Sequence, residues 1–173
     1  MTGCGVSHTT PDLTSRRPPR ARRGIDQLAA RARRQIDRHV LRAVVGHGDW
    51  RVEHLRFHNG ALTAVYDWDS LSAGPEPVFV GAAAHAFTSD WSIPGHPCVP
   101  TTDESLKFIA DYEAARGTPF EARERKVALA SLIATTAYSA RCEHSDNPTK
   151  RVPNGFVDKL EREGQRVLEQ ARP

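Results

Sequence analysis

The chain has 173 residues, a formal net charge of +3 and a pI near 9.0. At this length about 70% of the surface of the unfolded chain is buried on folding, so we expect one domain with its own core. Three cysteines, Cys4, Cys98 and Cys142, are odd in number and far apart, which excludes a disulfide scaffold and a zinc knuckle. No run approaches the ~18 apolar residues of a membrane span, and the N-terminus lacks the apolar stretch of a signal peptide. These features predict a cytoplasmic protein with no membrane partner.

The positive charge is concentrated near the N-terminus, where ten arginines lie between residues 15 and 42. Residues 1–23 are rich in Pro, Ser, Thr, Gly and Arg and have few large apolar groups, so we expect a disordered basic tail. Such a segment can bind nucleic acid or an anionic membrane surface. Basic, proline-rich termini are more often solvated, so we expect no nucleic-acid partner. The domain is then expected over residues 24–173.

The first half of that domain shows one helical pattern and then strand patterns. Apolar or small residues at three- and four-residue spacing predict an amphipathic helix from residue 25 to about residue 41. The short run at 43–46 is β-branched and predicts a strand. Asn59-Gly60 separates two alternating runs within residues 54–68, which predicts a β-hairpin because both turn positions tolerate a positive φ. The inward residues of the helix are Ile25, Leu28, Ala29, Ala32, Ile36 and Val40.

The second half is predicted to be helical. Residues 78–91 read as a buried helix and residues 92–102 as a loop, after which Thr101 and Glu104 form a capping box for a helix closed by Gly117. Residues 120–144 are apolar almost all round and should form the most buried helix. A last amphipathic helix is expected over 154–170, with Phe156, Val157, Leu160, Val167 and Leu168 facing inward. The expected fold class is α+β, mostly helical.

Three aspartates are placed where neighbouring segments end. Asp49 follows the strand at 43–46, and Asp67 and Asp69 end the second hairpin strand in the stretch VYDWDS. A hairpin of this register brings both segments to one edge, so we expect two or three carboxylates in a small volume. Like charges at close range require a cation or protons. Hard oxygen ligands with room for water suit Mg²⁺, and an aspartate outside the metal shell can orient a hydroxyl.

The stretch HGDWRVEH, followed by VYDWDS, resembles the catalytic loop and metal-binding segment of the aminoglycoside phosphotransferase and choline kinase-like family, relatives of the protein kinases. The family pattern is His-x-Asp-x-x-x-x-Asn and then a hydrophobic residue, Asp-x-Asp. The order of the parts, with a hairpin between the two motifs, carries the resemblance. It covers the chain from about residue 25 to its end.

The resemblance implies a role for each matching position. Asp49 would be the catalytic base for a substrate hydroxyl, and His47 would brace its loop. Asp67 would hold the Mg²⁺ that bridges the phosphates of ATP, with Asp69 as a second acidic group beside it. His54 stands where the family has a metal-binding Asn, and neutral imidazole is a poorer Mg²⁺ ligand than an amide oxygen. No nucleotide-binding residue is identified.

The chain departs from the family before the motif. A β-rich lobe that covers ATP and supplies a strand lysine needs on the order of 60 residues, whereas only the tail and one helix precede His47. All four lysines, Lys107, Lys126, Lys150 and Lys159, follow the site. We therefore expect the C-terminal, helical lobe of a protein kinase-like fold, without the N-terminal nucleotide-gripping lobe.

Three functions remain open at this stage. The first is a truncated small-molecule phosphotransferase that uses Mg²⁺ and ATP, transfers the γ-phosphoryl group to a hydroxyl acceptor, and is weak or inactive unless a separate N-lobe or protein partner joins it. The second is a non-catalytic remnant or a module that binds a metabolite or a protein. The third is a zinc or manganese hydrolase with His47, Asp49, His54 and Asp67 as ligands, whose donor set has the right softness.

Overall fold

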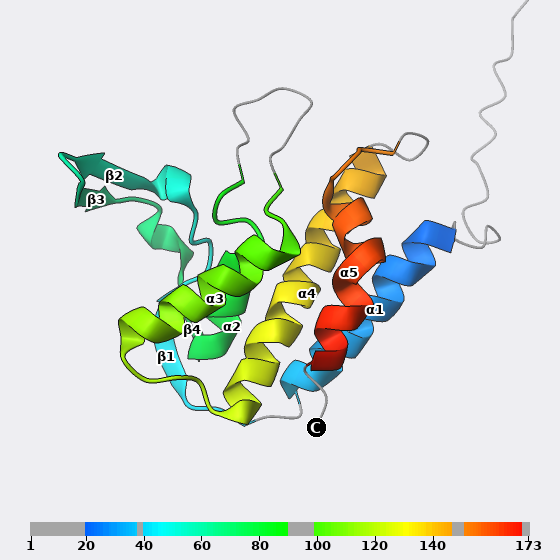
Figure 1. The fold of residues 1–173 in the computed structure, drawn as a ribbon, viewed down its shortest axis with the longest axis horizontal. Coiled ribbons are helices and arrows are strands. Elements are labelled where there is room, and N and C mark those ends of the chain that lie inside the picture. Colours follow the sequence, from blue (N-terminus) through cyan, green and yellow to red (C-terminus); the bar gives the residue numbers. More distant parts are fainter. Residues whose placement is uncertain (1–19, 38–39, 90–98, 147–150, 171–173) are drawn as a thin grey trace, which may run out of the picture.

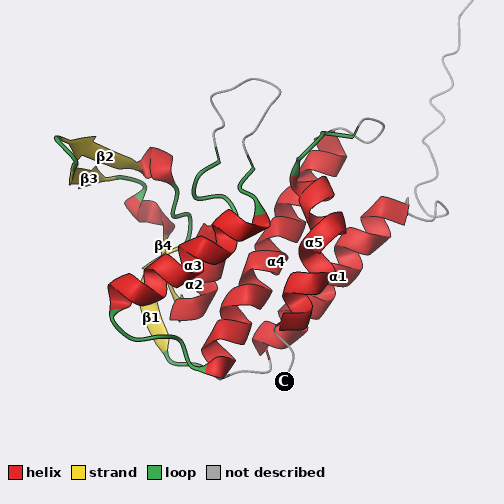
Figure 2. Ribbon diagram, viewed as in Figure 1, coloured by secondary structure: helices red, strands yellow, loops and turns green. Residues whose placement is uncertain are grey.

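The computed structural model describes residues 20–37, 40–89, 99–146 and 151–170. The body of this described part is formed by five α-helices: α1 (Arg20–Asp37), α2 (Glu76–Ala84), α3 (Thr102–Arg116), α4 (Ala122–Asp146) and α5 (Phe156–Gln170). Helix α4 is central and contacts α1, α2 and α5, while α3 lies against α2 (Figure 1). The strands lie at the other end of the molecule from α1 and α5 (Figure 2). The mostly helical α+β class is as predicted.

Within the described residues, four short strands form two separate antiparallel ribbons. Strand β1 (Ala43–His47) pairs with β4 (Leu71–Pro75), and β2 (Leu55–His58) pairs with β3 (Ala61–Val65). Two 3₁₀ turns, Val52–His54 and Trp68–Ser70, connect the ribbons. The β2–β3 hairpin projects away from the helices, so the connecting turns are supported by β1 and β4 at the edge of the helical body (Figure 1).

Helix α4 was predicted to be the most buried helix, and it has more buried residues than any other described helix, although a larger share of the shorter α2 and α5 is buried. Its residues 127–133 are buried without interruption, because neighbouring helices cover it on several sides. Gly81 of α2 allows one of these close approaches, since a Cβ there would lie 2.1 Å from the carbonyl oxygen of Ala128. The close packing of α2 against α4 therefore requires glycine at position 81.

Helix α1 differs from its prediction at both ends. It begins at Arg20, inside the segment expected to be a tail, because its arginines are good helix formers on a solvated face. It ends at Asp37, and Val40, expected to face inward, is 95% exposed. The predicted inward residues Ile25 and Ala32 are buried in the core. The disorder predicted for residues 1–19 lies outside the described residues.

The predicted hairpin is confirmed. Asn59 and Gly60 both have positive φ, 49° and 77°, as a two-residue turn of this type requires. A bulge between Arg56 and Phe57 shifts the register of β2. Strand β4 was not predicted, because Gly74 and Pro75 signal a turn. It forms because the chain after the hairpin returns antiparallel to β1, from His47↔Leu71 to Ala43↔Pro75.

The helices after β4 follow their predictions closely. Thr101 and Glu104 form the capping box of α3, and Gly117 closes the helix with φ 75°. Helix α2 is shorter than predicted: it ends at Ala84, and residues 90–98 lie outside the described residues. Among the described helices, none combines the length and the apolar character needed to cross a bilayer.

Two buried titratable groups sit in the helical body. Lys159 of α5, 8% exposed, donates to the carbonyl oxygen of Pro100 at 2.6 Å and to Ser105 Oγ at 2.9 Å. Burial lowers the pKa of Lys159 to about 8. His85, after α2, hydrogen-bonds the carbonyl oxygen of Ala82 and Ser139 Oγ, and burial lowers its pKa to about 4. Both groups are therefore less easily charged than in water.

Candidate functional site

The loop that carries Asp49 is tied at both ends to neighbouring backbone. Strand β1 ends at His47, and the N–H of Gly48 donates to the carbonyl oxygen of Ser70 at 2.8 Å. A Cβ on Gly48 would lie 3.2 Å from that same oxygen, so the close approach favours glycine. Further along, the N–H of Val52 donates to the carbonyl oxygen of Phe87 at 3.1 Å. The loop is thus fixed between the 3₁₀ turn that ends at Ser70 and the segment that follows α2.

His47 connects the Asp49 loop to the end of β3. Its Nε2 lies 3.2 Å from the carbonyl oxygen of Tyr66, which can only accept, so Nε2 carries the hydrogen. Its Nδ1 then accepts from the N–H of Asp49 at 3.3 Å. Both ring nitrogens of this neutral tautomer are engaged, so the ring acts as a bridge between the two aspartate-bearing segments.

Asp67 occupies a left-handed turn between β3 and the second 3₁₀ turn, with φ 65° and ψ 41°. Aspartate tolerates this conformation better than bulky residues do. The Ser70 hydroxyl donates to Asp67 Oδ2 at 2.5 Å, and this hydrogen bond is the main reason why the pKa of Asp67 lies below its ordinary value. The lowered pKa favours the ionised carboxylate, which attracts a cation.

Asp49 is paired with an arginine that the sequence gave no reason to single out. Arg51 Nη2 lies 2.7 Å from Asp49 Oδ2, and Nη1 lies 2.6 Å from Glu53 Oε1. The Nε of Arg51 is buried without a hydrogen-bond partner. In the sequence, the pair could have been suspected only from the two-residue separation of the opposite charges. That separation fixes no distance between side chains in a loop. The pair orients the Asp49 carboxylate, and a hydroxyl substrate would share it with Arg51.

His54 is brought to the site, but its ring nitrogens are already engaged. Its Nδ1 lies 2.9 Å from the carbonyl oxygen of Asp49, so Nδ1 carries the hydrogen, and Nε2 faces Arg51 Nη2 at 3.4 Å. Asp67 Oδ2 is 3.9 Å from His54 Nδ1. In this tautomer neither nitrogen offers a lone pair toward Asp67. The donor set fits a hard cation held by the Asp67 carboxylate better than a metal ligated by His54.

Among the described residues, one group of potential metal ligands combines His47, His54 and Asp67, whose ligand atoms lie within 4.8 Å of one another. This group contains neither Asp49 nor Asp69. Asp69 is exposed in the turn after Asp67. The structure thus brings His47, His54 and Asp67 together, with Asp49 joined to them through hydrogen bonds of its backbone. The four-ligand hydrolase site considered from the sequence has no such grouping here.

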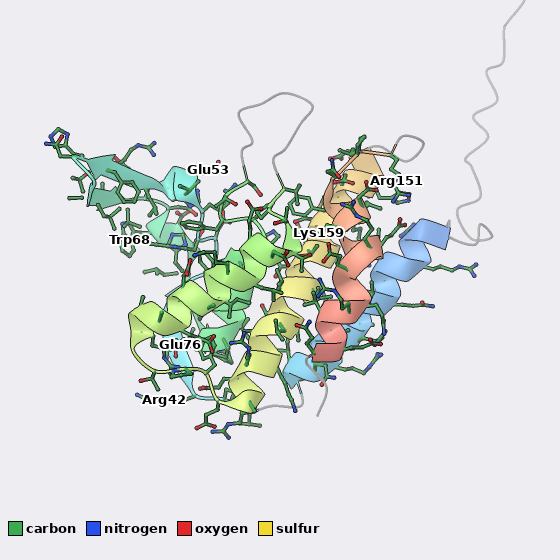
Figure 3. All side chains as sticks on the ribbon, in the orientation of Figure 1. Arg42, Glu53, Trp68, Glu76, Arg151 and Lys159 are labelled. Carbon is green, nitrogen blue, oxygen red and sulfur yellow. The ribbon has the colours of Figure 1, made fainter. Side chains whose placement is uncertain are left out.

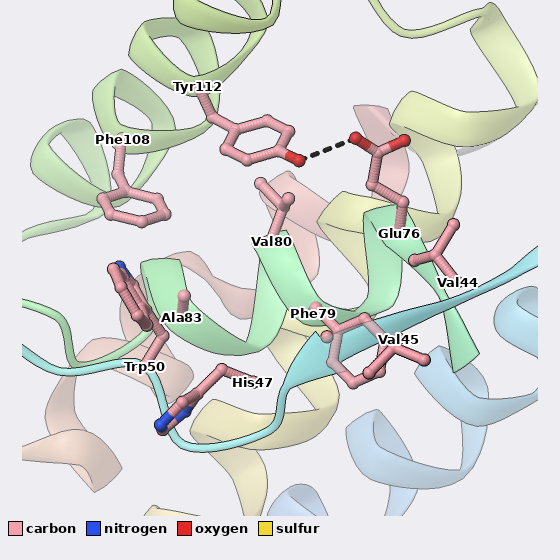
Figure 4. Close-up of a pocket in the computed structure, with 11 residues that line it drawn as sticks. Val44, Val45, His47, Trp50, Glu76, Phe79, Val80, Ala83, Phe108 and Tyr112 are labelled. Atoms are coloured by element: carbon pink, nitrogen blue, oxygen red, sulfur yellow. Dashed lines mark hydrogen bonds between the residues drawn. The ribbon is translucent and has the colours of Figure 1, made fainter. Parts of the chain in front are cut away.

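A pocket that the sequence did not indicate opens beside His47. It has a volume of about 470 Å³ and lies between β1, α2 and α3 (Figure 4). The lining residues are Val44, Val45, Gly46, His47, Trp50, Glu76, Phe79, Val80, Ala83, Phe108 and Tyr112. They come from four segments that meet only in the folded chain, so no local sequence motif could predict the pocket. Glu53 and Trp68, in contrast, lie near the hairpin at the margin of the molecule (Figure 3).

The chain was compared with known proteins. Residues 7–92 match the model of a phosphotransferase enzyme family. No curated protein matches the chain. Among solved structures, it resembles a choline/ethanolamine kinase family protein from Mesorhizobium loti with a TM-score of 0.53 and 15% sequence identity. The match covers 92% of this chain and 53% of the other, so this chain spans about half the length of that protein.

The structural likeness, at this identity, concerns the fold. The family match includes the whole of HGDWRVEH and VYDWDS, the two stretches that form the site described above. The family match and the fold both support an aminoglycoside phosphotransferase and choline kinase-like family for this chain.

Proposed function

We propose that this chain carries the acceptor and metal half of a phosphotransferase site, which transfers the γ-phosphoryl group of ATP to a hydroxyl of a small molecule. The observation that supports it best is the double connection between the two aspartate segments. One connection is the bridge through His47, and the other is the Gly48–Ser70 backbone hydrogen bond. Phosphoryl transfer depends mainly on positioning and charge stabilisation, and both connections serve positioning.

Each residue has a defined task in this proposal. Asp49, held by Arg51, accepts the proton of the acceptor hydroxyl as its oxygen attacks the γ-phosphorus. Asp67 holds Mg²⁺ through its ionised carboxylate, and Ser70 fixes the orientation of that carboxylate. When bound, Mg²⁺ neutralises charge on the phosphates. His47 keeps the two segments in register, and His54 positions the Asp49 backbone instead of ligating metal.

The nucleotide requires more than the described residues provide. Lys107, Lys126 and Lys159 lie on α3, α4 and α5, so no lysine of the described chain lies on a strand. Large apolar side chains are exposed on and beside the two ribbons: Val44, Val45, Phe57, Leu62, Tyr66, Trp68 and Leu71. Apolar surface of this kind commonly marks an interaction face. We propose that a β-rich, nucleotide-gripping half from outside residues 20–170 covers these faces.

The test is calorimetric titration of Mg²⁺-ATP into the full chain and into Asp67→Asn. Asp103→Asn is the matched control, because Asp103 is exposed on α3, far along the chain from the site. Binding by the wild type and by Asp103→Asn, but not by Asp67→Asn, supports the proposal and shows that a further half is dispensable for binding. Equal binding by Asp67→Asn contradicts the assigned role of Asp67.

The alternative is a module that binds a metabolite without catalysis. One observation favours it: the carboxylate expected to act as base already forms an ion pair with Arg51. Absence of any heat from Mg²⁺-ATP, both with the chain alone and after a β-rich partner half is added, in a chain whose helical circular dichroism confirms folding, would favour this alternative. Binding heat that appears only after a β-rich partner is added would instead support the phosphotransferase proposal.

A further inference from the structure

Helix α1 carries a set of arginines that the site described above does not use. Arg22, Arg23, Arg33 and Arg34 are exposed and form no ion pair among the described contacts. Most arginines elsewhere in the described chain pair with a carboxylate. The helix lies at the other end of the molecule from the ribbons (Figure 2). A ligand of these arginines would therefore leave the two aspartate segments free.

The spacing of the four arginines places them in two rows along α1. Arg22 and Arg33, like Arg23 and Arg34, are eleven residues apart. This separation is close to three helical turns, so the members of each pair lie nearly in line, about 16 Å apart along the axis. Helix α1 contains no lysine, and arginine is the cation that binds phosphate through two parallel hydrogen bonds. Repeated arginines of this kind match an anion that repeats along a chain.

A groove between α1 and α4 lies beside one of these rows. It has a volume of about 420 Å³, and four alanines line it together with Asp26, Arg33, Tyr138 and Arg141. Tyr138 is 68% exposed, so its ring is largely uncovered. Aromatic rings stack on nucleobases, and the bases of a single strand are free to stack in this way. The groove thus combines a stacking surface with cations.

Asp26 is the one carboxylate among the residues that line this groove. Its Oδ1 accepts from Arg141 Nη2 in an ion pair. Arg33 has no such partner among the described contacts. A phosphate beside Arg33 would therefore meet a free guanidinium, while the charge of Asp26 is already compensated.

An anionic membrane is the other polyanion that a basic helix can bind. Helices that lie in a membrane surface insert their apolar face, whereas Ile25 and Ala32 of α1 belong to the buried core. Apart from Val40 and Tyr138, the large apolar side chains exposed in the described chain lie on or beside the ribbons. A membrane would be held at α1 by charge alone. A single strand can use both the arginines and Tyr138.

We propose that α1 and the groove between α1 and α4 bind single-stranded nucleic acid, with phosphates held by the arginines and a base stacked on Tyr138. Sequence patterns alone predict no nucleic-acid partner, because basic, proline-rich termini are commonly solvated. The placement of Arg33 beside an uncovered aromatic ring on α4 exists only in the folded chain. The inference is independent of the phosphotransferase proposal, since it uses none of the same residues.

The test compares two strands of equal length and charge, a fluorescein-labelled oligothymidylate and an abasic strand. Each is titrated with the full chain and followed by fluorescence anisotropy at low salt. We expect the oligothymidylate to bind about fivefold more tightly or better, because only this strand offers bases to Tyr138. Its affinity should fall as salt is added, because phosphate contacts release counterions. Equal binding of the two strands, or no binding of either, would overturn the proposal.

Substitutions of Tyr138 test the stacking surface. Tyr138→Ala should abolish the preference for oligothymidylate, and Tyr138→Phe should keep it. The residue is exposed, so neither change alters the core. Tyr66→Ala is the matched control, because Tyr66 is also exposed but follows β3 beside the ribbons. A preference that survives in Tyr138→Ala contradicts the proposal.

The salt dependence tests the phosphate contacts. Arg33→Ala should reduce the slope of log K against log salt concentration by about 0.7, the value for one phosphate contact of a single strand. Arg42→Ala is the matched control: Arg42 is exposed beside β1 and has no ion pair among the described contacts (Figure 3). Its slope should equal that of the wild type. An unchanged slope in Arg33→Ala counts against the proposal.

Two competitors separate this inference from its alternatives. Tighter binding to vesicles of phosphatidylcholine and phosphatidylserine than to oligothymidylate would make α1 a membrane-binding face and overturn the inference. Mg²⁺-ATP should leave the bound strand in place, because its proposed site contains Asp67 and not α1. Displacement of the strand by Mg²⁺-ATP would place the strand at the phosphotransferase site and overturn the inference as well. The heat of Mg²⁺-ATP binding continues to test the phosphotransferase proposal separately.

Discussion

Ser70 contacts both aspartate segments at once: its carbonyl oxygen accepts from the N–H of Gly48, and its hydroxyl donates to Asp67 Oδ2. A single residue of the 3₁₀ turn thereby positions the Asp49 loop and orients the Asp67 carboxylate. The backbone contact survives any substitution at residue 70, whereas the hydroxyl contact does not. The two contributions can therefore be separated by mutation.

Ser70→Ala is expected to raise the pKa of Asp67 toward its ordinary value, because the lost hydrogen bond is the main cause that lowers it. The measurement is a titration of the Asp67 carboxyl carbon by ¹³C NMR. Ser72→Ala on β4 provides the control, since the Ser72 side chain has no hydrogen bond to Asp67 among the described contacts. A pKa of Asp67 that stays low in Ser70→Ala would mean that another group holds it.

Gly46→Ala is expected to destabilise the chain by roughly 1–3 kcal/mol, the usual cost of overpacking. A Cβ at Gly46 would lie 2.5 Å from the ring of Phe79, which packs against the β1–β4 ribbon at Gly46 and Gly74. Urea unfolding measures the change, and Phe79→Leu should recover part of it. Gly24→Ala on α1 is the matched control: nothing lies within 4 Å of its Cβ, so helix propensity should stabilise it by about 0.5–1 kcal/mol. An equal change in the free energy of unfolding for Gly46→Ala and Gly24→Ala would show that the Phe79 ring does not constrain Gly46.

Stability is expected to fall as the pH is lowered from about 6.5 to about 4, because of His85. Its pKa is lowered to about 4 in the folded chain, so over this range the unfolded chain binds a proton that the folded chain does not. The loss approaches about 3 kcal/mol if this group acts alone. Urea unfolding at a series of pH values, compared with His85→Gln, isolates the effect. If the free energy of unfolding of His85→Gln falls with decreasing pH as steeply as that of the wild type, other groups cause the acid sensitivity.

The titration of Lys159 is expected to make the free energy of unfolding rise with pH in the alkaline range, as the titration of His85 does in the acid range. Between about 8 and 10.5 the unfolded chain holds a proton on this amine that the folded chain has released, so stability should rise with pH by up to about 3 kcal/mol. Lys159→Met keeps most of the volume and removes the titration. Its unfolding free energy should be flat over this range relative to the wild type. A parallel rise in Lys159→Met would contradict the assignment.

Local signals in the sequence predicted local structure well. The Asn59-Gly60 turn, the Thr101–Glu104 capping box and the glycine at 117 each act within a few residues, so their outcome depends little on the rest of the chain. The extent of α1 was missed because its end is set by where packing against α4 stops, and by where the chain must turn toward β1. Strand β4 was missed for a related reason, since its partner lies 24 or more residues earlier.

The candidate site was predictable as a set of positions but not as a set of contacts. The two motifs indicated five residues, His47, Asp49, His54, Asp67 and Asp69. The structure brings His47, His54 and Asp67 together, joins Asp49 to the two histidines through its backbone, and leaves Asp69 exposed beside them. The tautomer of His54 could not be read from the sequence, because it depends on the carbonyl oxygen of Asp49. The pairing of Arg51 with Asp49 depends on loop geometry in the same way. The pocket required the assembly of β1, α2 and α3.

The two ribbons have a consequence for evolution. In the described chain each strand pairs along one side only, so every strand has an edge without a neighbouring strand. Pairing at such an edge uses backbone N–H and C=O groups and is largely indifferent to side chains. A β-rich half could therefore drift widely in sequence, or be exchanged for another, and still be accommodated. Modular recombination of this sort would let one helical body pair with different β-rich halves.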